Sequence, residues 1–282
     1  MRHLIRVSLA LAIATPAFAQ KQTPPAPGPA KDFRVPTRRN FTLPNGMHVS
    51  LTHYGTIPKV FVRLAVRGGH QLEKPDEVTL TDLMADMMQE GTTSRSAEEL
   101  ARQVASMGGT LAVFPGPDRT NLTGDVLSER AADFVAIVAD VARNPAFPQS
   151  EFARVKSTRL RNLSIARSQA QTLAAERFAA AVYGYHPYGR INPTEAMLSG
   201  FTLEQTKKFW ADNFGAARAE LYVTGVFDDA SVEAAVRRAF GDWEHGPDPV
   251  DVPLPPAPTT RSLALIDRPD AVQSTIIVGL RT

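Results

Sequence analysis

The stretch Arg67–Thr92 reads RGGHQLEKPDEVTLTDLMADMMQEGT, and it decides how the rest of the chain is interpreted. Strand-like residues lead into it, and its second half is helical in pattern from Val78 to Glu90 and stops at Gly91. Three methionines would give this helix an apolar stripe of the kind that any core helix shows: Met84, Met87 and Met88.

The segments on either side of this stretch predict both strands and helices. Strands are predicted at Met47–Tyr54, Val60–Arg67, Thr110–Phe114, Arg119–Val126 and Ala219–Thr224. Further helices are predicted at Ala97–Met107, Ser128–Ala142, Gln149–Gln169, Leu173–Val182, Leu203–Asn213 and Ala230–Phe240.

The first residues have the pattern of a cleavable export signal. Arg2 and Arg6 give a positive start, Val7–Ala14 is a short apolar core, and Ala17-Phe18-Ala19 fits the small-x-small cleavage site. The apolar core is too short to span a bilayer, and a buried helix is the alternative interpretation. The sequence therefore predicts a signal peptide over residues 1–19, cleavage after Ala19, and a periplasmic or secreted protein.

Charge and cysteine content exclude several classes of function. Without Arg2 and Arg6, the count of Lys and Arg falls from 31 to 29, which equals the 29 acidic residues. A nearly neutral mature chain gives no reason to expect binding to nucleic acid or to an anionic membrane. The chain has no cysteine, so disulfides, thiolate nucleophiles and Cys-ligated metals are impossible. No segment after the signal is long and apolar enough to be a membrane span.

Proline-rich segments divide the mature chain. The predicted parts are a Pro-rich tether at 20–40, an N-terminal domain at 41–245, a Pro-rich linker at 246–260, and the incomplete start of a second, similar domain at 261–282. This last part contains two strand-like segments, Leu263–Ile266 and Ser274–Leu280. Two strands cannot form a core alone, so either the native chain continues or these strands pack on the first domain.

The stretch Arg67–Thr92 resembles the zinc-helix region of the insulinase/pitrilysin peptidase family. There a strand ends in Gly, a loop carries a Glu, and a helix carries H-x-x-E-H shortly before Gly-Thr. Anchored on Gly91-Thr92, the two His positions fall on Asp82 and Asp86, and the general-base Glu falls on Ala85. The family's third ligand, a Glu on a later helix, falls on Asn162.

Other family-like landmarks follow in the family's order: Tyr185–Gly189, Leu221–Gly225, Phe240–Trp243 and Asp267–Pro269. The resemblance extends from about Phe41 to the end of the chain. It implies an α+β fold in which a mostly antiparallel β-sheet is packed on one side by several helices, as half of a clam-shell chamber.

The substituted residues predict that this chain lacks the family's zinc site. Zinc-dependent peptide hydrolysis needs three protein ligands, an open position for water and a base that takes the proton of the water. Ala85 has no proton acceptor, and Asp82, Asp86 and Asn162 do not reproduce a His-His-Glu set. We expect no catalytic residue, no metal and no cofactor in this chain, with Asp82 and Asp86 as polar helix surface lining a cavity.

Three functions are compatible with this sequence. The resemblance implies a non-catalytic subunit that completes the chamber of a zinc-bearing family partner and holds an unfolded or extended peptide, often by β-strand addition. The alternative is a stand-alone periplasmic peptide-binding or scaffold protein. A third hypothesis is an active hydrolase with a hard metal ion at Asp82 and Asp86. By itself, the chain is not expected to be an enzyme.

Overall fold

The computed structural model describes residues 28, 32, 34–269 and 271–281. The predicted signal peptide, and most of the predicted tether, lie outside the described residues. The chain divides into two units, Met1–Val35 and Pro36–Thr282, and the fold belongs to the second.

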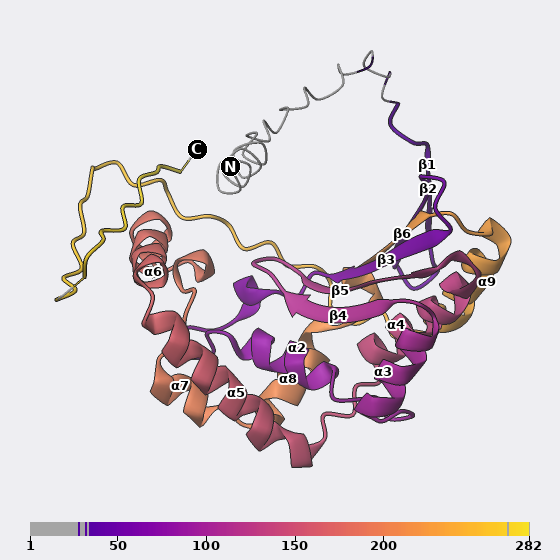
Figure 1. Cartoon of the computed structure of the whole chain (residues 1–282), viewed down its shortest axis with the longest axis horizontal. Helices are drawn as coiled ribbons and strands as arrows, with labels where there is room; N and C mark the ends of the chain where they lie inside the picture. The colour runs from indigo at the N-terminus through magenta and orange to yellow at the C-terminus, as the bar shows by residue number, and fades with distance from the viewer. Residues whose placement is uncertain (1–27, 29–31, 33, 270, 282) are drawn as a thin grey trace, which may run out of the picture. The chain divides into compact units, whose positions relative to one another are not determined.

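A six-stranded sheet forms the centre of this unit (Figure 1). Its strands are β1 (Arg38–Thr42), β2 (His48–His53), β3 (Lys59–Val66), β4 (Thr110–Pro115), β5 (Thr120–Leu127) and β6 (Ala219–Gly225). The strand order is β1-β2-β6-β3-β5-β4, in which β2 and β6 are parallel and the other neighbouring pairs are antiparallel. The predicted α+β fold with a mostly antiparallel sheet is confirmed, and the sheet begins at Arg38, slightly before the predicted domain start.

One face of the sheet carries the hydrophobic core. In β3, Val60, Val62, Leu64 and Val66 are all fully buried, and they alternate with more polar positions such as Lys59 and Arg63. Since successive side chains of a strand point to opposite faces, the alternation places these apolar side chains on one face. Helices lie against this face (Figure 1).

The helices are α2 (Leu80–Met88), α3 (Ala97–Ser106), α4 (Ala131–Arg143), α5 (Gln149–Arg167), α6 (Ala170–Tyr183), α7 (Glu195–Gly200), α8 (Leu203–Asn213) and α9 (Asp229–Phe240). Helix α2 lies beside β4, α5 and α8. The methionine stripe predicted for α2 is confirmed, because Met84, Met87 and Met88 are fully buried. None of the described helices is long and apolar enough to cross a membrane.

Helix α2 is shorter than the predicted helix Val78–Glu90. Thr79 has φ +67°, a left-handed conformation that stops the helix from extending backwards, and Gly91 has φ +112°. Gly91 and Thr92 instead form isolated bridges to Ser96 and Pro145. The Gly-Thr pair used to align the sequence therefore lies in the turn that follows the helix.

The prediction of two strands near the C-terminus is wrong. Leu263–Ile266 and Ser274–Leu280 contain neither strand nor helix, and the exposed fractions of Leu263 and Val278 are 86% and 89%. Strand-like sequence forms a strand only when a neighbouring strand supplies hydrogen bonds, and none of the described strands lies beside these residues. The predicted linker 246–260 likewise contains no helix or strand.

Candidate functional site

The positions that the sequence aligns with zinc ligands lie where helices α2 and α5 pack together. Asp82 and Asp86 are one helical turn apart on α2, so their carboxylates share one face. Ala85 lies on the same helix, three residues after Asp82, and is fully buried in the hydrophobic core. The position of the family's general base therefore holds an apolar side chain with no proton acceptor.

Arg159 of α5 binds both carboxylates. Its Nε and Nη2 donate to the two carboxylate oxygens of Asp86, and the Nη2–Oδ1 distance is 2.7 Å. Its Nη1 donates to Oδ1 of Asp82 at 3.0 Å, and Nη2 also donates to the Asp82 carbonyl at 3.1 Å. A fork-like guanidinium is well suited to such two-point binding of a carboxylate. The side chains of Asp82 and Arg159 are only 19% and 28% exposed.

This ion pair changes the interpretation of the two aspartates. They were expected to be polar helix surface, yet both are paired with a cation on another helix. Burial opposes the charged form of Arg159, but its hydrogen bonds to Asp86 and the negative charges of both aspartates raise the pKa of Arg159 above its usual value. The guanidinium of Arg159 binds the carboxylates that a metal ion would need. The three aligned ligand positions, Asp82, Asp86 and Asn162, include no imidazole. These residues do not fit a catalytic zinc ion.

Asn162 lies on the same helix as Arg159, close to one turn further on. It is exposed, and it lines an open cavity of about 480 Å³ together with Asp86 and Arg159. The structure therefore brings Asn162 and Asp86 to one cavity, as the sequence alignment implied. Asn162 supplies a neutral amide there in place of a carboxylate.

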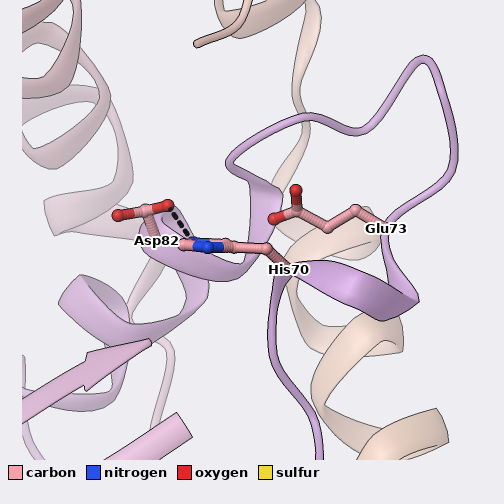
Figure 2. Close-up of side chains that lie close together, drawn as sticks. All are labelled: His70, Glu73 and Asp82. Atoms are coloured by element: carbon pink, nitrogen blue, oxygen red, sulfur yellow. Dashed lines mark hydrogen bonds and ion pairs between the residues drawn. The ribbon is translucent and has the colours of Figure 1, made fainter. Parts of the chain in front are cut away.

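A second group of side chains adjoins Asp82. Figure 2 shows His70 and Glu73, from the segment before α2, beside Asp82. One possible metal-ligand atom from each of the three side chains lies within 4.8 Å of the other two, a spacing that could suit a cation. Each group already has a partner, however: Nε2 of His70 lies 2.8 Å from Oδ2 of Asp82, and the other Asp82 oxygen accepts from Arg159.

Glu73 stabilises the start of α2. Its two carboxylate oxygens accept hydrogen bonds from the backbone N–H groups of Thr79 and Thr81, each at 2.9 Å. The first N–H groups of a helix lack partners within the helix, so a carboxylate here caps them and interacts favourably with the helix dipole. Burial raises the pKa of the Glu73 carboxyl, although nearby His70 and these backbone donors oppose the increase.

Replacing Glu73 by Ala is expected to lower the free energy of unfolding by about 1–2 kcal/mol, because it leaves two N–H groups at a largely buried helix start without acceptors. Urea denaturation measures this decrease in the free energy of unfolding. Glu73→Gln keeps one acceptor oxygen, so its free energy of unfolding should decrease less. Equal losses in the two variants would contradict a capping role.

The pairing of His70 with Asp82 should make stability depend on pH. Burial lowers the pKa of His70, but the hydrogen bond to Asp82 and the charges of Asp82 and Glu73 raise it to a net value above the usual one. A histidine with a raised folded-state pKa stabilises the fold fully below its unfolded pKa of about 6.5, and this contribution is lost as pH rises through the folded pKa.

The variant His70→Gln should therefore be less stable than the wild type by a larger margin at about pH 6 than at about pH 8.5. Urea denaturation of both proteins at the two pH values measures this difference. A margin that is the same at both values, or larger at high pH, would show that the His70–Asp82 pair does not depend on a protonated imidazole.

The sequence pattern did not reveal Arg159 or His70 as site residues. The available signal for Arg159 was its position three residues before Asn162, which places both on neighbouring turns of α5. For His70, the signal was its place in the loop whose Glu aligns with the family motif. Neither signal identifies Asp82 as the shared partner, since that depends on how α5 and the loop pack against α2.

A mixed sheet covered by helices, with Asp82, Ala85 and Asp86 on α2 at the positions that the sequence aligns with the H-x-x-E-H motif, defines the chain as a metallopeptidase-like domain. A family model described as insulinase (peptidase family M16) matches residues 49–193, and one described as the peptidase M16 inactive domain matches residues 200–282. The chain belongs to peptidase family M16.

Individual relatives agree with this assignment. An uncharacterized zinc protease of Rickettsia bellii is 26% identical over 72% of this chain and 50% of its own length. A probable mitochondrial-processing peptidase subunit alpha-2 of Arabidopsis thaliana is 26% identical over 80% of this chain and 45% of its own length. The chain therefore spans about half the length of the curated relatives it matches.

Solved structures show the same fold. The structure of a peptidase M16 inactive domain from Pseudomonas fluorescens superposes with a TM-score of 0.71 at 20% identity, covering 78% of this chain and 54% of that one. A protease from Helicobacter pylori gives a TM-score of 0.70 at 17% identity, covering 79% and 54%.

Proposed function

We propose that this chain is an exported, non-catalytic member of its family, which completes the chamber of a zinc-bearing family subunit and helps to hold an extended peptide there. The observation that carries the proposal is the pairing of Arg159 with both Asp82 and Asp86, next to a buried Ala85. An ion pair at the metal position and the lack of a base leave no means of activating water.

The relatives support the pairing with a second chain. They include mitochondrial-processing peptidase subunits alpha, of Arabidopsis thaliana and Solanum tuberosum, whose names describe them as parts of larger enzymes. The family resemblance implies that, in two-chain members, one subunit carries zinc and the other lacks it. The zinc cofactor is accordingly assigned to the partner.

Export is part of the proposal and rests on the sequence of residues 1–19. A signal peptide cleaved after Ala19 would release a periplasmic or secreted protein that begins at Gln20. Mass spectrometry of the mature N-terminus in fractionated cells tests this part. A chain that keeps Met1, recovered with the cytosol, would contradict it.

The functional test is a reconstitution. Purified alone, the chain should hydrolyse no unfolded peptide, and affinity purification from its native cells should recover a family subunit with an intact H-x-x-E-H motif. Mixing the two should increase peptide hydrolysis over that of the zinc subunit alone, since the chain positions the substrate. Recovery of the chain without such a subunit would instead favour a stand-alone peptide-binding or scaffold protein.

A further inference from the structure

Strand β4 lies at one edge of the sheet and pairs only with β5 among the described strands. The hairpin that joins them closes with a hydrogen bond from the Gly116 N–H to the Arg119 carbonyl. Because hydrogen-bonded and non-bonded pairs alternate in an antiparallel ladder, Leu111, Val113 and Pro115 direct their backbone groups away from β5. An edge of this kind is a template for another strand.

The side chain of Gln89 occupies the middle of this edge. Its Oε1 accepts from the Val113 N–H at 3.2 Å, and its Nε2 donates to the Val113 carbonyl at 3.2 Å. The same Nε2 lies 3.3 Å from the Ala85 carbonyl on α2, which holds the amide in place. Both outward-facing backbone groups of Val113 are therefore satisfied by one side chain.

The primary amide of glutamine has the same donor and acceptor groups as a peptide bond. Gln89 thus makes with Val113 the two hydrogen bonds that one residue of an added antiparallel strand would make. On one side of Val113, Pro115 has no N–H to offer. A polypeptide that added to this edge would find its central position already taken.

We propose that Gln89 is a built-in occupant of the β4 edge, and that an extended segment of a bound peptide adds to this edge only by displacing the Gln89 amide. The inference rests on the proposed function, because it treats an extended peptide as the ligand. The Gln89–Val113 hydrogen bonds would weaken peptide binding by this chain. Only peptide segments that compete successfully with the Gln89 amide would then bind at the β4 edge.

The first arm of the test measures amide hydrogen exchange at the β4 edge without any ligand. In the 282-residue chain, Gln89→Leu keeps a similar volume and removes both hydrogen bonds to Val113. The Val113 amide should then exchange with deuterium at least about tenfold faster. Gln89→Met provides a second, flexible isostere, and Gln149→Leu, at an exposed position of α5, is the matched control. Unchanged exchange in both Gln89 variants would overturn the inference.

The second arm measures peptide binding by fluorescence anisotropy. The probe is a labelled Thr/Val-rich peptide of about ten residues, and its control carries N-methyl groups at alternate residues and cannot form a full ladder. Gln89→Leu should bind the unmodified peptide about tenfold more tightly than wild type or Gln149→Leu, because no internal amide competes. The N-methylated peptide should show no such gain.

The outcomes separate this inference from the proposed function. Equal binding of the unmodified peptide by wild type and Gln89→Leu would overturn the inference and leave the proposed function standing. A second outcome is that the Val113 amide exchanges faster in Gln89→Leu but neither Gln89→Leu nor the wild type binds the peptide. This result would contradict peptide addition at the β4 edge and also the proposed peptide-holding role.

Discussion

Replacement of Arg159 by Met is expected to lower the free energy of unfolding by about 2–3 kcal/mol, measured by urea denaturation at neutral pH. The variant leaves the carboxylates of Asp82 and Asp86 close together, partly buried and without their cation. Removing one partner of a buried ion pair costs about 3–5 kcal/mol, and the value here is reduced because the Asp86 side chain is 31% exposed.

Two controls separate charge from packing in this experiment. Arg154→Met, on the same helix, removes an arginine whose side chain is 58% exposed and should cost much less. Adding Asp82→Asn and Asp86→Asn to Arg159→Met should recover most of the lost stability, since no uncompensated charge is left. Equal losses for Arg154→Met and Arg159→Met would contradict a special role for Arg159.

Restoring the ligand types of the zinc helix is expected to be insufficient for zinc binding. A variant with Asp82→His, Asp86→His and Asn162→Glu should bind zinc only weakly, because the guanidinium of Arg159 repels the ion and would pair with the new glutamate. Two unit charges about 4 Å apart interact by about 4 kcal/mol at an effective dielectric constant of 20, and because zinc is divalent this is a lower bound for its repulsion by Arg159. Adding Arg159→Ala should therefore raise the zinc affinity roughly 1,000-fold, measured by competition with a chromogenic chelator.

The single substitution Asp86→His serves as the matched control for this series. It should restore neither zinc binding nor peptidase activity, because three other positions of the site have also changed. Tight zinc binding by the variant with three new ligands and an intact Arg159 would show that the guanidinium does not block the site.

Local sequence patterns predicted most of the fold. The alternation of apolar and polar residues in Val60–Val66 fixes which face of β3 is buried, and the Pro115–Pro117 turn signals the hairpin of β4 and β5. The same reasoning failed for Leu263–Ile266, because β-propensity describes a residue's fit to a sheet and cannot supply the neighbouring strand.

The candidate site was predicted only in part, for a related reason. A motif frame locates Asp82, Ala85 and Asp86 because they lie on one helix at fixed spacing. The residues that determine their chemistry come from elsewhere in the chain: Arg159 is 73 residues from Asp86. Which arginine of α5 meets the aspartates depends on how that helix packs against α2, and sequence spacing does not contain this information.

Zinc analysis of the purified chain tests the central claim most directly. The 282-residue chain should be expressed in zinc-rich medium, separated from any family partner and analysed by plasma mass spectrometry, before and after dialysis against a weak chelator. If Arg159 has taken the place of the metal, the dialysed protein should hold far less than one zinc ion per chain. One tightly held zinc ion per chain, lost in Asp82→Ala with Asp86→Ala, would contradict the account.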